Sequence, residues 1–203
     1  MFEAARIHGL RHLVLVFALA MTVAACASSQ ESRTGTVDIG PGVTLALPDR
    51  PPFGAEANVV QLGQATYQDR TVIFQAVISS TPGTMALVMT LPSGPRVMSF
   101  TWSDGALKSK LESIAPKGLS ADHMLADIML IYAPADLLRQ VISGADLVER
   151  PDGSRSLVRD GKELITVIRT PDASPNIWIG RATLENKAFG YRLSIDSRAL
   201  GAN

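Results

Sequence analysis

Few side chains in this sequence are suited to covalent or acid–base chemistry, and they lie far apart. Cys26 is the only cysteine in 203 residues, and His123 is the only histidine beyond His12. A Ser-His-Asp or Cys-His site in the body of the chain would therefore depend on His123. No group of His, Cys, Asp and Glu has the spacing of metal ligands. We expect no enzyme activity, no metal and no cofactor, with His123 facing solvent.

Acylation of the thiol is the chemistry that Cys26 does support. Basic residues at the start of the chain precede an apolar run and two small residues, which is the order of an export signal. The run is shorter than the roughly 18 apolar residues that a spanning helix needs. Val23-Ala24-Ala25-Cys26 resembles the lipobox of bacterial lipoproteins. This implies a signal peptide over residues 1–25 and a lipid-attachment site at Cys26. An ordinary A-x-A cleavage site beside a chance cysteine is the alternative.

The residue after the cysteine and the charge balance bear on location and partners. Ala27 stands where enteric lipoproteins retained in the inner membrane carry Asp, so the resemblance implies an outer-membrane lipoprotein that faces the periplasm. Two or more acyl chains make such anchoring stable. Beyond the signal peptide the formal charge is about −1 by counting, without a basic stripe for nucleic acid. We expect a monomer whose partners are the membrane and a lipid or acylated ligand.

Most of the chain has the pattern of a β-rich domain. Residues 27–40 are small and polar, which predicts a flexible tether, so we divide the mature chain into an acylated tether (26–42) and one domain (43–203). Asp-Gly pairs at 104, 152 and 160 mark tight hairpins. Short runs rich in Val, Ile, Phe, Thr and Trp predict strands at 71–80, 85–91, 96–102, 106–111, 147–150, 154–159, 163–169, 177–185 and 191–196. Together they predict a curled antiparallel meander.

One segment has a helical pattern instead. Residues 120–132 begin with the N-cap candidate Ser120 and have Asp122 in the first turn. A second short helix is predicted at 136–142. The first helix is apolar over more than one stripe, so it is either nearly buried or faces an apolar ligand. The run 128–132 alone also fits a strand.

Asp127 is the acidic residue inside this apolar helix. An unpaired buried carboxylate is unfavourable. We therefore expect Asp127 to face solvent or to pair with a base such as Arg139, as a structural residue.

The residues resemble a known family of small outer-membrane lipoproteins of unassigned function, related to the lipoprotein localisation factors of the LolA and LolB type. The resemblance rests on residues 125–134, on Arg155-Ser156-Leu157 with Asp160-Gly161, and on Trp178 with the residues around Leu184 and Tyr191. It implies a mainly β, α+β fold: a half-open antiparallel β-barrel covered by short helices around an apolar cavity. LolB-type receptors carry a large apolar residue on an early loop, whereas residues 80–83 have none.

Aromatic and apolar residues of the predicted strands and helix are the candidates for a cavity wall that binds lipid. They are Phe74, Phe100, Trp102, Met124, Ile128, Tyr132, Trp178 and Tyr191. Inward-facing residues have the same pattern whether they contact a ligand or each other, so plain core packing is the alternative. Our leading hypothesis is a lipid-binding lipoprotein that assists lipid or lipoprotein transfer. The second is a non-enzymatic interaction module that docks a complex at the membrane.

Overall fold

The computed structural model describes residues 28–54, 56–172 and 174–201. The predicted signal peptide (1–25) and Cys26 lie outside these residues. Within the described part, every helix is too short or too polar to span a bilayer.

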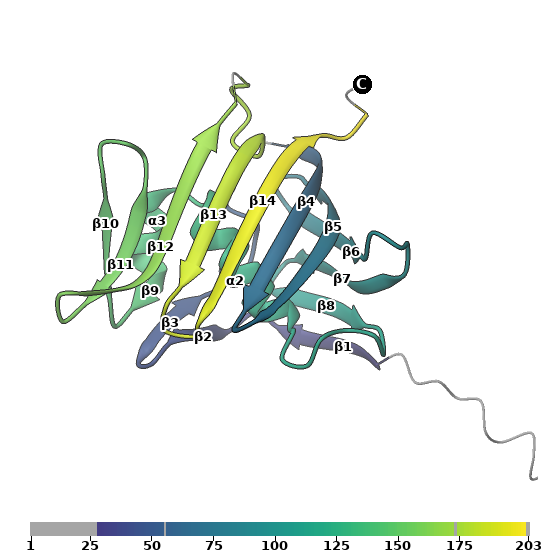
Figure 1. Ribbon diagram of the computed structural model, residues 1–203, viewed down its shortest axis with the longest axis horizontal. Helices are drawn as coiled ribbons and strands as arrows, with labels where there is room; N and C mark the ends of the chain where they lie inside the picture. The colour runs from purple at the N-terminus through teal and green to yellow at the C-terminus, as the bar shows by residue number, and fades with distance from the viewer. Residues whose placement is uncertain (1–27, 55, 173, 202–203) are drawn as a thin grey trace, which may run out of the picture.

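An eleven-stranded antiparallel sheet makes up most of the fold (Figure 1). In sheet order its strands are β1 (Ser28–Arg33), β8 (Ala106–Leu111), β7 (Arg96–Ser103), β6 (Thr84–Thr90), β5 (Arg70–Ser80), β4 (Ala57–Tyr67), β14 (Tyr191–Ala199), β13 (Gly180–Asn186), β12 (Lys162–Pro171), β11 (Arg155–Arg159) and β10 (Asp146–Glu149). The edge strands β1 and β10 each pair with one neighbour among the described residues, so this sheet does not close into a barrel. The predicted mainly β architecture with short helices is confirmed.

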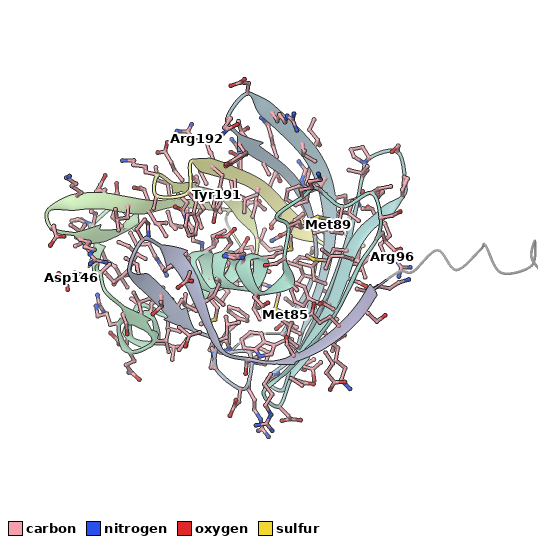
Figure 2. The ribbon with its side chains drawn as sticks, turned by 90° about the horizontal axis from the view of Figure 1, so that it is seen from below. Met85, Met89, Arg96, Asp146, Tyr191 and Arg192 are labelled. Atoms are coloured by element: carbon pink, nitrogen blue, oxygen red, sulfur yellow. The ribbon has the colours of Figure 1, made fainter. Side chains whose placement is uncertain are left out.

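Two helices and a small sheet cover the concave side. Helix α2 (Ala121–Tyr132) lies inside the curve of the large sheet, and α3 (Ala135–Val141) follows it directly. A three-stranded sheet of β2 (Thr36–Gly40), β3 (Val43–Ala46) and β9 (Ile142–Ser143) lies on the other side of α2 (Figures 1 and 2). Helix α2 is therefore enclosed between two sheets.

The inner face of the large sheet follows from side-chain alternation. Along β5, Phe74, Ala76 and Ile78 are buried while their neighbours face outwards. The same alternation on β6 buries Met85, Leu87 and Met89. A two-residue period turns one apolar set toward α2 and leaves the other in solvent.

Two of the three predicted Asp-Gly turns and the predicted helix start match the structure. The third differs, because Asp152 does not have positive φ and residues 150–154 form a longer loop between β10 and β11. Asp104 and Asp160 have φ of 46° and 52° in the β7–β8 and β11–β12 hairpins, as an Asp-Gly turn requires. The Ser120 hydroxyl caps α2 by accepting from the backbone N–H of His123 at 3.2 Å. The strand alternative for residues 128–132 is wrong, because they form the second half of α2.

The structure differs from the sequence prediction in residues 28–40, which were expected to form a flexible tether. β1 pairs with β8 from Ser28, opposite Leu111, to Arg33, opposite Ala106. β1 has no apolar alternation, because it is joined to the sheet edge by its backbone and by the ion pair of Glu31 with Lys108 at 3.4 Å, and such a strand leaves no apolar pattern in the sequence. β2 contributes Val37 and Ile39 to the core.

Two further strands differ from the predicted pattern. β4 is long but is not marked by the sequence, because Gln61, Gly63 and Gln64 interrupt its apolar residues. β13 begins at Gly180, so Trp178 lies in the preceding turn, where the Asn176 side chain accepts from its backbone N–H at 2.9 Å.

Gly63 is required by its cross-strand partner. It lies opposite Phe74, whose ring covers the glycine so closely that a Cβ there would be 2.1 Å from a ring carbon. Phe74 is itself buried. The ring can therefore occupy this inner position only because residue 63 has no side chain.

We predict that Gly63→Ala destabilises the protein by about 1–3 kcal/mol, because the added methyl group overpacks a buried position. Denaturant unfolding measures this change. Gly83→Ala is the matched control, since a Cβ at Gly83 meets nothing within 4 Å. The loss should be smaller when Phe74→Leu is combined with Gly63→Ala than the two single losses added together. Strictly additive effects would contradict the overlap.

Candidate functional site

The eight predicted cavity residues all belong to one apolar cluster between the concave sheet and α2. Six of them are buried: Phe74, Phe100, Trp102, Ile128, Tyr132 and Trp178. Met124 and Tyr191 are half-buried at its margin. Residues from distant parts of the sequence therefore meet in one interior.

Aromatic rings form the centre of this interior. Tyr132 of α2 stacks on Trp178, with ring centroids 4.4 Å apart and planes at 28°. Phe53 packs edge-on against Trp178 at 4.8 Å and against Trp102 at 6.3 Å. Sequence reasoning missed Phe53, because it follows two prolines between β3 and β4 and has no strand pattern around it. These contacts join the segments before β4 and β13 to the end of α2.

The two indole N–H groups have different surroundings. Trp102 Nε1 donates to the Pro48 carbonyl at 3.1 Å. Trp178 Nε1 is buried without a hydrogen-bond partner among the described residues. A buried donor without an acceptor is unfavourable. The Trp178 indole N–H is therefore a hydrogen-bond donor in the interior to which no acceptor of the described residues is bonded.

Basic side chains hold the C-terminal end of α2. Arg155 of β11 donates to the Ala133 carbonyl at 2.8 Å, which satisfies a backbone acceptor at the helix end. The Arg169 guanidinium lies 5.4 Å from the centroid of the Tyr132 ring and also donates to the Ile177 carbonyl. Burial lowers the pKa of both guanidinium groups from their ordinary values.

Tyr132 also has a polar partner at its hydroxyl group. Gln61 Nε2 of β4 donates to Tyr132 Oη at 3.0 Å, and Ser197 Oγ of β14 lies 3.5 Å away. Burial is the main reason that the pKa of Tyr132 is raised. The last residue of α2 is thus fixed by stacking on one side and by hydrogen bonding at its tip.

Asp127 is a half-buried acidic residue in the middle of α2. It accepts a hydrogen bond from Tyr191 Oη at 2.7 Å. Burial raises its pKa to about 7, and the bond from Tyr191 partly offsets this increase. The expected partner was wrong: Arg139 pairs with Asp136 at 2.8 Å and with Glu149 at 3.0 Å instead. Arg139 lies on α3, which starts after the turn at Pro134 and has its own acidic neighbours.

The hydrogen bond at Asp127 belongs to a longer network. Asn186 Nδ2 donates to the Ile39 carbonyl at 2.9 Å and lies 3.5 Å from Tyr191 Oη. Burial and the nearby Asp127 raise the pKa of Tyr191. The network therefore connects α2 with β14, with the end of β13 and with β2. Its members lie on both sides of α2.

His123 is exposed, as predicted, at the start of α2. Its Nε2 lies 3.1 Å from the Asp38 carbonyl, and its Nδ1 lies 2.9 Å from Ser120 Oγ. Because a carbonyl only accepts, Nε2 donates, and in the neutral ring Nδ1 accepts from the Ser120 hydroxyl. His123 therefore joins α2 to β2. No group of three metal-ligating side chains occurs among the described residues.

Two open hollows were identified on the described surface. One of about 470 Å³ lies over β1, β8, β7 and β6, and includes Phe100 among its lining residues. The other, of about 360 Å³, lies beside the start of α2 and is lined by residues such as Arg33, Val37 and His123. Neither includes the other seven predicted cavity residues. In this conformation α2 and its neighbours occupy the space that the prediction left for a ligand.

Residues 58–199 match the family described as "Protein of unknown function (DUF3261)", and the chain belongs to this family. The family resemblance predicted from the sequence is confirmed by this match. Among solved structures, the chain is similar to a LolA superfamily protein from Nitrosomonas europaea. The two are 12% identical with a TM-score of 0.45, over 76% of this chain and 90% of the other. No curated protein matches the chain.

We predict that Asp127→Asn removes a pH dependence of stability. Asp127 ionises near 3.8 when unfolded but only near 7 when folded, so the folded state binds the extra proton between these values. Stability from this group therefore falls as the pH rises from about 4 to about 7. Asparagine still accepts from Tyr191 and carries no charge. Above pH 7 the variant should exceed the wild type by on the order of 1–3 kcal/mol.

Denaturant unfolding between pH 4 and pH 8 measures this effect. Asp122→Asn, in the first turn of the same helix, is the control and should keep the wild-type slope. An Asp127→Asn variant with the wild-type slope would show that the carboxylate is not buried against Tyr191.

Proposed function

We propose that this protein is a membrane-anchored, non-enzymatic lipid binder of the outer membrane that holds an acyl chain between the concave sheet and α2. The observation that carries the proposal is the nature of α2. Eight of its residues are buried, although it is joined to the sheets by side chains alone. An acyl chain could replace an apolar helix of this kind at the same surface of the sheet. In this conformation α2 acts as the cover of a half-barrel.

The surface under α2 is suited to acyl chains of varied shape. Met85, Met89 and Met98 are buried in it, and Met129 is buried on α2 itself. Figure 2 shows Met85 and Met89 inside the curve of the sheet, near α2. Methionine side chains are flexible and fill irregular spaces, so they adapt to different apolar partners. The free indole N–H of Trp178 adds a donor for a polar group at the end of such a ligand.

The attachment of α2 is sensitive to proton concentration near neutrality. Because the pKa of Asp127 is raised to about 7, this carboxylate is close to half-ionised at neutral pH. Ionisation disfavours the buried position. The closed packing of α2 is therefore not at its most stable at neutral pH, which supports a cover that opens.

The anchor is a separate part of the proposal. The sequence up to Cys26 supports export, acylation of the cysteine and retention at the outer membrane on the periplasmic side. The lipid on Cys26 keeps the domain at a membrane surface, where acyl ligands are found. Transfer of lipid or lipoprotein between membranes is the process that such a position serves.

A second function is favoured by the outer face of the sheet. Leu62, Ile73, Val77 and Val88 are exposed there on β4, β5 and β6. Val60, Val77 and Val88 lie in one cross-strand row. An apolar patch over a filled interior is typical of a module that docks another protein. This alternative needs no opening of α2.

We predict that the unacylated mature chain, with Cys26→Ser, retains acyl lipid after incubation with a bacterial membrane extract and repurification. Solvent extraction and mass analysis measure the bound lipid. Met124→Ser at the margin of the interior should weaken retention about tenfold, since it removes roughly 1–2 kcal/mol of apolar contact. Ile168→Ser is the matched control, because Ile168 is exposed on the outer face.

Repeated recovery of lipid-free protein that carries Cys26→Ser as its one substitution would contradict the proposed ligand. Equal losses in Met124→Ser and Ile168→Ser would place the lipid outside the interior. In the first case the docking function remains as the candidate.

We predict that Cys26→Ser in the full-length chain abolishes incorporation of labelled palmitate and leaves the precursor unprocessed by the lipoprotein signal peptidase. The thiol is the acceptor of the lipid, and a hydroxyl does not replace it. Gel mobility and label incorporation in cells measure both effects. Ser32→Ala, in β1, is the control and should be processed normally. A labelled Cys26→Ser protein would show that the lipid is attached elsewhere.

A further inference from the structure

The sheet begins almost at the predicted lipid-attachment residue. Only Ala27 separates Cys26 from Ser28, the first residue of β1. Two residues span at most about 7 Å. β1 is paired along its whole length with β8, and Ser28 lies opposite Leu111. A lipid on Cys26 must therefore enter the membrane close to this end of the sheet.

We call this region the anchor end: the β6–β7 turn (residues 91–95), Arg96, Leu111 and the loop 112–119. The strand register brings its parts together. Leu111 pairs with Met98 of β7, and the Glu112 N–H donates to the Val97 carbonyl at 3.0 Å. Figure 2 shows Arg96 beside the start of β1, while Asp146 of β10 lies at the opposite side of the molecule.

The side chains of the anchor end suit a membrane surface. Ile114 is 48% exposed in the loop after β8. Arg96 and Lys117 are exposed, and neither has an ion-pair partner among the described residues. Glu112 is the acidic residue of the anchor end, and its carboxylate pairs with Lys110 at 3.1 Å. Free cations beside an exposed aliphatic residue favour contact with anionic headgroups.

We infer that the anchor end rests on the surface of an anionic phospholipid layer and gives the domain one orientation on the membrane. Arg96 and Lys117 bind lipid phosphates, and Ile114 inserts at the level of the headgroups. The β10 edge points away from the membrane. The inference rests on the proposed acylation of Cys26, but it does not require that a second lipid binds under α2.

Site-specific labelling tests this orientation on the acylated protein. Since the thiol of Cys26 carries the lipid, an introduced cysteine is the one free thiol of the mature chain. Ile114→Cys and, as its control, Asp146→Cys are labelled with an environment-sensitive fluorophore. Both are reconstituted in vesicles of phosphatidylcholine and phosphatidylglycerol. Nitroxide-labelled lipids should quench the label at 114 strongly and the label at 146 little.

Charge reversal tests the cations. Arg96→Glu with Lys117→Glu, in the Ile114→Cys background, should lose more than half of the quenching while the protein still floats with the vesicles. Arg181→Glu with Lys162→Glu is the matched control on two other exposed cations, and it should keep the quenching. Circular dichroism checks that each variant is folded.

Equal quenching at 114 and 146 on vesicle-bound protein would overturn the inference, as would unchanged quenching after charge reversal. Protein that does not float with vesicles would contradict the acyl anchor and the orientation together. Lipid retention by the unacylated chain is measured separately, so a failure of the proposed lipid-binding interior is distinguishable from a failure of the orientation.

Discussion

Burial of α2 against the concave face of the large sheet is the interaction on which the rest of the structure depends. A sheet of this size has one apolar face that must be covered. Leu125, Met129 and Tyr132 of α2 are buried, and Tyr132 is hydrogen-bonded to Gln61 of that sheet. The small β2–β3–β9 sheet encloses the helix from the other side. Removing α2 would expose both surfaces at once. The helix is thus the shared core element of the two sheets.

The same burial explains why the polar groups on α2 are arranged as they are. Ser120 and Arg155 satisfy backbone groups at the two ends of the helix. The backbone groups in the middle of the helix are bonded within the helix itself, so its apolar side chains need no polar partner. Asp127 is the exception, and its network through Tyr191 fixes the rotation of the helix about its axis. This network makes the packing specific, while the raised pKa of Asp127 makes it less stable near neutral pH. The specificity and the pH sensitivity of this packing therefore both depend on Asp127.

The proposed lipid on Cys26 lies only two residues before β1 in the sequence, which bears on the expected behaviour of the molecule at a membrane. A flexible tether would allow the domain to rotate freely. Under the proposed acylation of Cys26, a paired edge strand that starts two residues later would limit this freedom and couple membrane attachment to domain orientation. The interior under α2 then has a defined position relative to the bilayer that supplies its proposed ligand.

Features that depend on residues close together in the chain could be predicted from the sequence. Asp-Gly hairpins, the Ser120 cap, the apolar α2 segment and most strands of the sheet were predictable because local backbone preference and side-chain period encode them. The lipobox-like motif that ends at Cys26 is local in the same sense, and the acylation it indicates stays a prediction. The eight cavity candidates lie in or against one apolar cluster, and their contact with a ligand stays a prediction.

The contacts of those residues with distant segments could not be predicted, because they depend on how the chain folds. β1 is polar and pairs through its backbone, so no side-chain pattern marks it. Phe53 meets Trp178 across a long stretch of chain, and Asp127 meets Tyr191 rather than Arg139, because chain topology brings them together. The filling of the interior also depends on tertiary packing. The sequence near a residue indicates whether its side chain points inwards, but the side chain that it packs against comes from a distant segment.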